Sequence, residues 1–356
     1  MLRNREARPG HRAVALSTLV AVAVLAVGAC GSSSTTSAPP ATTAPTAPGT
    51  TGTPAAAAEG SVTLLSYNVA GLPKEISKVD PLLHIPTIAT KLSPYDVVLT
   101  QEDFDWWQPQ LDALDFSHYH ERLRAETSMF PFRSDRHPGP AAAGLDAATR
   151  PTLLVGDGLG YLSKLPVRDV QRVAWKNCFG GANTKDGGAS DCLSMKGFMV
   201  GTYTLGTSAA GPVEADIYSW HMEAGATPAD QDVQKQDLDQ LAAFMEQHSK
   251  GRAIILTGDS NLHTGNDTNP DGRSGDSTDT DLWNAFQART GVTDMCASFA
   301  CVDPDSIDKL AFRSSDTVKL TPTARAYPTQ DFKDDEGEDL SDHPPLVVTV
   351  AWRRAA

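Results

Sequence analysis

The stretch Ala253-Ile254-Ile255-Leu256-Thr257-Gly258-Asp259-Ser260-Asn261 is the strongest fold signal in the sequence. Its apolar run is rich in β-branched residues and predicts a buried strand. Gly258 predicts the end of that strand, at a point where the backbone approaches another group closely. If the strand pleat persists, the side chains of Asp259 and Asn261 lie on one side of the chain and can face one small anion. The alternative interpretation is an ordinary Gly-Asp-Ser-Asn turn.

Segments on both sides of this stretch read alternately as strands and helices. Residues 233–247 place Leu238, Leu241, Ala242 and Met245 on one face of a helix that leads into the strand. Further helices are expected at 81–92 and 283–289, and further strands at 61–68, 96–102, 158–163, 195–200, 213–222, 306–312 and 346–350. This order predicts an α+β fold, a four-layer α/β/β/α sandwich of two mainly antiparallel sheets with helices outside.

The N-terminal sixty residues differ in composition from the rest of the chain. Residues 1–29 combine four arginines with an apolar run and end in Val27-Gly28-Ala29-Cys30, which resembles a bacterial lipoprotein signal. That resemblance implies cleavage before Cys30 and a lipid on its thiol, whereas an ordinary signal peptide with an incidental cysteine is the alternative. Residues 30–59 are rich in Ser, Thr, Ala and Pro and predict an extended tether with a reach of about 90 Å. The catalytic domain is then expected at 60–356.

The charge of the chain is strongly negative. The whole sequence carries a net charge of −14. Residues 1–29 hold four arginines and one glutamate, a net charge of +3, so the mature chain is near −17. Such a surface does not attract a polyanion and argues against tight nucleic-acid binding.

Four cysteines follow Cys30 in the sequence: Cys178, Cys192, Cys296 and Cys301. An even number of cysteines in an exported chain suggests two disulfides. The sequence-local pairing is Cys178–Cys192 and Cys296–Cys301, and four free buried thiols are the alternative.

Polar side chains gather at the ends of the expected strands. Strands end at or before Asn68, Glu102, His221, Asp259 and Asn261, and others start near Asp308, Asp342 and His343. Because the end of one antiparallel strand and the start of its neighbour share an edge, these groups are expected to meet. Clustered carboxylates without thiolates call for a hard divalent cation such as Mg²⁺ or Mn²⁺. The two imidazoles are candidates for moving protons, although a lone histidine at a strand end is often structural.

Five short motifs, in order, resemble the signature of the endonuclease/exonuclease/phosphatase superfamily. This family includes deoxyribonuclease I, abasic-site endonucleases, inositol-polyphosphate phosphatases and neutral sphingomyelinases. The resemblance spans residues 61–350 and rests on Ser66-Tyr67-Asn68-Val69, Gln101-Glu102, Gly258-Asp259-Ser260-Asn261, Ile307-Asp308 and Ser341-Asp342-His343.

The resemblance implies roles for the metal and for the attacking water. Glu102 would ligate the catalytic Mg²⁺ with Asn68 beside it. Asp259 would orient or deprotonate water, and Asn261 would hold a phosphate oxygen. We therefore expect a Mg²⁺-dependent phosphodiesterase.

The same resemblance implies roles for the histidines and their neighbours. His343, positioned by Asp342, would stabilise the reacting phosphorus or pass a proton. Asp308 would orient a histidine or the metal shell. His221 matches the histidine of a Thr-His-Leu pattern, which here reads Trp220-His221-Met222.

One further stretch is similar to bacterial sphingomyelinases. Asn177 to Phe198 contains a cysteine loop followed by Lys196-Gly197-Phe198. This similarity implies that Lys196 contacts the substrate phosphate, whereas a solvated lysine after a structural loop is the alternative. The finer expectation is therefore a sphingomyelinase-like phospholipid hydrolase. A nuclease of the deoxyribonuclease I type and a non-catalytic envelope-binding module on the same fold are the alternatives.

The remaining expectations concern ions and partners. Asp267-Thr268-Asn269-Pro270-Asp271-Gly272 matches half of an EF-hand loop, but Thr278 stands where the loop needs glutamate. A solvated acidic loop is expected, with a weak structural Ca²⁺ site as the alternative. The expected partners are a phosphodiester substrate, either phospholipid or nucleic acid, and the outer face of the cell membrane through the N-terminal lipid. The chain is expected to be a monomer.

Overall fold

The computed structural model describes most of the C-terminal five-sixths of the chain. The residues described are 59–72, 77–104, 123–125, 128–135, 137, 139–146, 148, 150, 152–181, 188–264, 277–299, 301 and 306–355. All belong to one compact unit, Gly52–Ala356. The predicted signal peptide, Cys30, tether residues 30–58 and the acidic loop Asp267–Gly272 lie outside the described residues.

Two six-stranded sheets form the centre of this unit. The first has the strand order β11-β12-β1-β2-β4-β3 and the second has the order β5-β6-β7-β8-β10-β9. One pair in each sheet is parallel, β1 with β2 and β7 with β8, and the remaining pairs are antiparallel. The strands are β1 (Glu59–Asn68), β2 (Val97–Gln101), β3 (Phe132–Arg133), β4 (Gly160–Ser163), β5 (Val167–Ala174), β6 (Gly197–Ser208), β7 (Gly211–His221), β8 (Ala253–Asp259), β9 (Thr293–Asp294), β10 (Asp308–Arg313), β11 (Val318–Ala326) and β12 (Leu346–Arg354).

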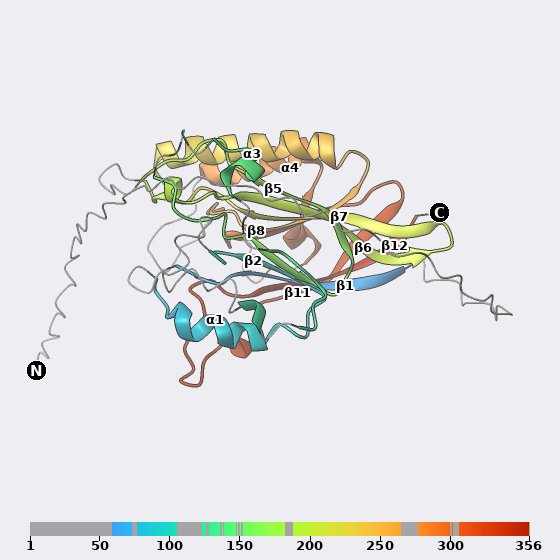
Figure 1. Cartoon of the computed structure of the whole chain (residues 1–356). Helices are drawn as coiled ribbons and strands as arrows, with labels where there is room; N and C mark the ends of the chain where they lie inside the picture. Colours follow the sequence, from blue (N-terminus) through green and yellow to red (C-terminus); the bar gives the residue numbers. More distant parts are fainter. Residues whose placement is uncertain are drawn as a thin grey trace, which may run out of the picture. The chain divides into compact units, whose positions relative to one another are not determined.

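Helices cover the two outer faces of this pair of sheets (Figure 1). Helices α3 (Pro228–His248) and α4 (Ser277–Thr290) pack on the second sheet, where Leu241 and Phe286 share a core with Leu256 of β8. Helix α1 (Pro81–Thr90) packs on the first sheet, where Ile85 contacts the core around Leu65. A third core fills the space between the sheets. The predicted four-layer sandwich is confirmed.

The helix boundaries follow from local capping chemistry. Helix α1 begins at Pro81, and the preceding Asp80 accepts a hydrogen bond from the amide of Leu82. Helix α3 begins after Thr227, whose side chain and that of Asp230 form a reciprocal capping box. In the part of the chain that is described, no helix combines the length and apolar character needed to cross a membrane.

The strand that opened the sequence analysis runs further than expected. It continues through Gly258 and ends at Asp259. Gly258 has φ 137°, and a Cβ atom there would lie 2.2 Å from the carbonyl oxygen of Trp220. The close approach predicted for Gly258 is therefore confirmed, but the strand end predicted at this residue was wrong by one position. The extra residue places the Asp259 side chain on the sheet itself.

Candidate active site

The ends of neighbouring strands bring the predicted polar residues together. Asn68 is the last residue of β1, and Glu102 directly follows β2, which lies parallel to β1. His221 and Asp259 end β7 and β8 and are paired in register. Asp308 begins β10 and is paired with Asp259 in the antiparallel direction. One edge of each sheet thus contributes to a single polar centre.

Asn68 joins the carboxylates of the two sheets. Its Nδ2 donates hydrogen bonds to Glu102 Oε1 at 3.1 Å and to Asp259 Oδ2 at 3.1 Å. Its Oδ1 accepts a hydrogen bond from the amide of Ala70 at 3.0 Å, which fixes the amide orientation. Asn68 therefore holds the two acids at a set separation, and its predicted role as a metal ligand stays a prediction.

Glu102 occupies an unusual backbone conformation. Its φ is 53°, in the left-handed region that residues other than glycine rarely adopt. The amide of Gly71 donates to the Glu102 carbonyl at 3.0 Å, and a Cβ atom at Gly71 would lie 2.2 Å from that oxygen. Backbone strain of this kind costs on the order of 1–3 kcal/mol and persists where the surroundings impose it. With this backbone, a carboxylate oxygen of Glu102 lies within 4.8 Å of donor atoms of His221 and Asp259.

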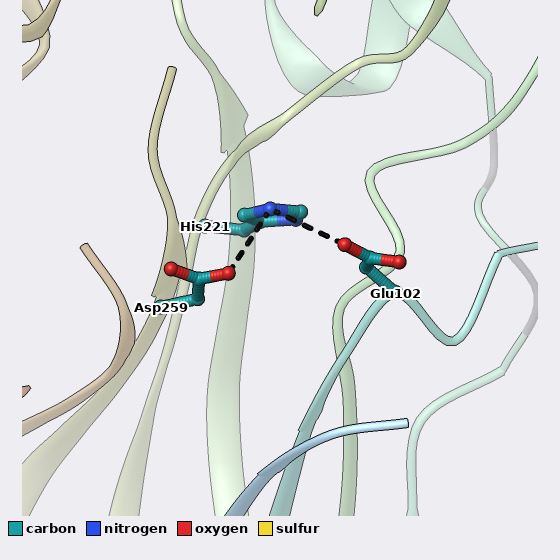
Figure 2. A group of neighbouring side chains, drawn as sticks. All are labelled: Glu102, His221 and Asp259. Carbon is teal, nitrogen blue, oxygen red and sulfur yellow. Dashed lines mark ion pairs between the residues drawn. The ribbon is translucent and has the colours of Figure 1, made fainter. Parts of the chain in front are cut away.

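His221 lies between the two acids (Figure 2). Its Nε2 is 3.6 Å from Asp259 Oδ2 and 4.0 Å from Glu102 Oε1. Complete burial lowers the pKa of His221 well below its usual value, and the positive charges of Lys196 and His343 lower it further. The imidazole is therefore neutral near pH 7 in the metal-free site and can accept a proton.

His343 has the opposite charge state. Its Nδ1 is hydrogen-bonded to Asp308 Oδ2 at 2.9 Å, and its Nε2 is 3.7 Å from Asp259 Oδ2. Burial alone would lower the pKa of His343, but Asp308 and Asp259 outweigh burial and raise it to about 10. In the absence of metal, His343 is an imidazolium that can donate a proton or bind an anion.

Asp342 does not hold the ring of His343. Its Oδ2 pairs instead with Nζ of Lys78 at 3.3 Å near the surface. The sequence predicted that Asp342 positions His343, whereas the structure gives this contact to Asp308, one of the two roles expected for that residue. Asp342 acts on the imidazole through its charge, which helps to raise the pKa of His343.

Asn261 and Lys196 both donate to one carbonyl. Asn261 Nδ2 lies 3.1 Å from the carbonyl oxygen of Met222, and Lys196 Nζ lies 3.2 Å from the same oxygen. Asn261 has φ 51°, and its backbone amide donates a hydrogen bond to Asp259 Oδ1 at 3.0 Å. The two residues predicted to contact the phosphate, Asn261 and Lys196, therefore lie close together. The sequence did not predict that both would bind the carbonyl oxygen of Met222.

Lys196 is a buried ion-pair partner and not a solvated lysine. It is 9% exposed, and its Nζ is 2.5 Å from Asp191 Oδ1. Burial lowers the pKa of Lys196, but Asp191 outweighs burial and raises it. Sequence reasoning missed Asp191, because nothing in the local pattern distinguishes it from the other polar residues of the cysteine loop.

Both predicted disulfides are present. Cys178 is bonded to Cys192, and Cys296 is bonded to Cys301. The first bond lies next to Asp191, so it fixes the chain that carries the Lys196 ion pair.

The donor atoms fit a hard divalent cation. Among the described residues, Glu102, His221 and Asp259 offer atoms within 4.8 Å of one another, as do Asp259, Asp308 and His343. Burial raises the pKa of Glu102, and it also raises the pKa of Asp259. The carboxylates of Glu102 and Asp259 therefore lack a compensating positive charge when no ion is bound. Oxygen donors in such surroundings suit Mg²⁺ or Mn²⁺.

The two-sheet fold and the polar residues at the ends of its strands define this protein's class, the phosphoric ester hydrolases. A sequence model of the Endonuclease/Exonuclease/phosphatase family matches residues 65–337, and the chain belongs to that family.

The chain is similar in sequence to mycobacterial sphingomyelinases. The chain is 30% identical over 307 residues to a sphingomyelinase of Mycobacterium tuberculosis, and it matches one from Mycobacterium bovis equally well. The match covers 83% of this chain and 54% of the relative. The chain thus spans about half the length of the curated relatives.

Solved structures show the same fold. Beta toxin from Staphylococcus aureus, in a mutant form with bound magnesium ions, gives a TM-score of 0.53 at 14% identity and covers 81% of this chain and 99% of the toxin chain. Sphingomyelinase C from Streptomyces griseocarneus gives 0.51 at 17% identity, with 83% and 100% covered.

Proposed function

We propose that this chain is a Mg²⁺-dependent phosphodiesterase that hydrolyses a phospholipid in the manner of a sphingomyelinase. One observation carries the proposal. The neutral His221 and the cationic His343 approach the same carboxylate, Asp259, from two sides. Two titratable groups whose pKa values are driven apart are the expected arrangement for acid and base chemistry.

The metal would be held by Glu102 with Asn68 beside it, and Asp259, on the other side of Asn68, would face the attacking water. When bound, Mg²⁺ supplies positive charge for the phosphate oxygens. Its presence would also remove the shortage of positive charge that burial creates at the two carboxylates.

The other residues have roles in moving protons and holding the phosphate. Asp259 accepts a proton from the attacking water, and His221 stands within reach to share that proton. His343 donates a proton from Nε2 to the leaving oxygen while Asp308 holds its Nδ1. Asn261 and Lys196 bind phosphate oxygens beside Met222, Asn261 by hydrogen bonds and Lys196 as a positive point charge.

The test is turnover of bis(p-nitrophenyl) phosphate and of a panel of natural substrates. The panel contains sphingomyelin, phosphatidylcholine, plasmid DNA, RNA and inositol phosphates, each with Mg²⁺, Mn²⁺ or Ca²⁺. We expect choline phospholipids to be cleaved with Mg²⁺ and the activity to stop with EDTA. Asp259→Ala should lower kcat at least ~100-fold, because it removes the acceptor for the proton of water. Cleavage of DNA alone would favour the nuclease alternative. If no compound is turned over, the non-catalytic envelope-binding module becomes the favoured alternative.

We propose further that the protein is secreted and anchored at the outer face of the cell membrane. The lipoprotein-like signal that ends at Cys30 supports this location. The tether would let the catalytic domain reach a phospholipid headgroup away from the anchoring lipid.

A further inference from the structure

The peptide unit between Glu102 and Asp103 is held from two sides. The amide of Gly71 donates to the Glu102 carbonyl at 3.0 Å, and the amide of Asp103 donates to the carbonyl of Gly158 at 2.9 Å. Because the carbonyl and the amide of a trans peptide point in opposite directions, these two hydrogen bonds hold the unit from opposite ends. While both bonds persist, Glu102 cannot relax its left-handed conformation by rotating the peptide that follows it.

Gly158 supplies one side of this hold at very short range. Its φ is 68°, also in the left-handed region. A Cβ atom there would lie 2.7 Å from the ring of Phe104 and 3.2 Å from Cα of Glu102, so the absence of a side chain permits the approach. Gly158 lies in the turn that precedes β4, and the shape of that turn decides whether its carbonyl reaches the amide of Asp103.

Arg172, on the edge strand β5 of the second sheet, holds both neighbours of Gly158. Its Nη1 donates to Asp157 Oδ1 at 2.6 Å and to the carbonyl of Leu159 at 2.9 Å. Asp157 Oδ1 also accepts from the amide of Leu159 at 3.0 Å, which closes the turn around Gly158. Arg172 Nη2 donates to the carbonyl of Asp135 at 3.2 Å, which fixes the guanidinium itself. One side chain of the second sheet therefore sets the position of a turn that belongs to the first.

The ion pair of Arg172 with Asp157 is buried. The two side chains are 10% and 5% exposed. Burial raises the pKa of Asp157, but the positive charge of Arg172, with smaller contributions from His137 and hydrogen bonds, outweighs burial and lowers it. His137 Nε2 lies 3.6 Å from Asp157 Oδ2, and burial lowers the pKa of His137, so this imidazole is neutral at pH 7. Arg172 is therefore the charged partner that keeps Asp157 ionised and in place.

We propose that Arg172 is a positioning residue for Glu102, the residue that would hold the metal. The inference rests on the proposed Mg²⁺-dependent function. Arg172 acts on Glu102 through the turn at Gly158, whose carbonyl holds the peptide that follows Glu102. Without Arg172 this turn loses its support, and the backbone of Glu102 relaxes toward an unstrained conformation. Metal then binds only the fraction of molecules in which the carboxylate is in place, so the apparent Kd rises by the inverse of that fraction.

The experiment measures binding of Mn²⁺ to the full chain by the electron paramagnetic resonance signal of the free ion. Glu102→Gln identifies the signal of this site, because it removes the ligand itself. Arg172→Met should raise the Kd at least ~10-fold, about 1.4 kcal/mol. The hydrogen bond from Gly71 remains in this variant, so binding is weakened and not abolished.

Turnover of bis(p-nitrophenyl) phosphate on the same preparations separates metal binding from chemistry. At limiting Mg²⁺ the turnover by Arg172→Met should fall in proportion to the lost affinity. At saturating Mg²⁺ its kcat should return to within about twofold of the wild type, because every group that touches the substrate is unchanged. A variant that is damaged throughout the active site would not recover in this way.

A matched control comes from the same strand. Arg168, also on β5, pairs with Glu214 at 2.8 Å and is 51% exposed, and Arg168→Met should leave the Kd for Mn²⁺ unchanged. Arg172→Met leaves the Asp157 carboxylate buried without its cation, which destabilises the fold. The double variant Asp157→Asn with Arg172→Met contains no unpaired charge and should show the same weaker binding of Mn²⁺.

The outcomes for the proposal and for the proposed function are distinct. A wild-type Kd for Mn²⁺ in either Arg172 variant, or a loss of kcat that saturating Mg²⁺ does not restore, would overturn the positioning role. Equal binding of Mn²⁺ by Glu102→Gln and the wild type would also overturn it. A wild type that binds Mn²⁺ but hydrolyses no phosphodiester would instead contradict the phosphodiesterase function, and the comparison of Kd values would still decide the role of Arg172.

Discussion

His221 and His343 differ in charge because their neighbours differ. His343 has a carboxylate on Nδ1, whereas His221 Nδ1 has no hydrogen-bond partner among the described residues. His343→Gln should lower kcat at least ~100-fold on bis(p-nitrophenyl) phosphate, because glutamine cannot donate a proton to the leaving oxygen. His248→Gln, at the end of α3, is the matched control. Full activity of the His343 variant would remove this histidine from the mechanism.

The buried pair of Lys196 and Asp191 makes a prediction about stability. Lys196→Met leaves the Asp191 carboxylate buried without its cation, and we expect the free energy of unfolding to fall by about 3–5 kcal/mol. The double variant Asp191→Asn with Lys196→Met should lose less, because no unpaired charge remains. Urea unfolding at constant slope measures both changes. Equal losses in the single and double variants would contradict the pair interpretation.

The sequence predicted site residues correctly where a polar side chain stands at the end or the start of a strand. Asn68, Glu102, His221, Asp259 and Asp308 all stand at such positions, and the structure gathers them. The burial of Lys196 could not be predicted, because it depends on a carboxylate in an irregular loop and on the Met222 carbonyl that follows another strand. The choice of Asp308 over Asp342 as partner of His343 likewise depends on how two distant segments meet.

At the scale of elements, the two ends of the loop closed by Cys178–Cys192 contact a group of buried acids. The backbone amide of Phe179, next to Cys178, donates to Glu223 Oε1 at 2.6 Å, and Asp191 Oδ2 accepts from the amide of Ala224 at 3.0 Å. Burial, together with the smaller effect of the negative charge of Asp191, raises the pKa of Glu223 to about 9. The folded protein therefore retains a proton on Glu223 that the unfolded chain releases at neutral pH.

This retained proton sets the sign of a pH dependence. Between the ordinary glutamate pKa of 4.5 and about 9, the folded state binds more protons than the unfolded state, so stability falls as pH rises. One proton contributes at most about 1.4 kcal/mol per pH unit. Glu223→Gln keeps an acceptor for Phe179 and should flatten the fall in unfolding free energy between pH 6 and pH 8.5. Glu336→Gln, on the surface, is the control, and an unchanged pH profile in the Glu223 variant would contradict the assignment.

At the scale of the whole molecule, the layer architecture was predictable but the strand order was not. Alternating strands and helices with one apolar face each admit few arrangements other than two packed sheets with helices outside. The order of strands depends on contacts between distant segments, such as β1 lying between β2 and β12. The motifs predicted only that certain strand ends meet at one edge, which does not determine the order of the strands between them.

The last prediction concerns where the molecule acts. Cys30→Ser removes the thiol that the lipoprotein-like signal would modify. We expect the variant to leave the membrane fraction and to collect in the medium, or to keep its signal peptide, because the lipid that the signal implies would be attached through the thiol of Cys30. Fractionation followed by mass measurement of the mature N-terminus distinguishes the two outcomes. Turnover of bis(p-nitrophenyl) phosphate by the released variant should equal that of the wild type, since the active site begins at Asn68. A variant that is processed normally and still remains on the membrane would show that another part of the chain holds it there.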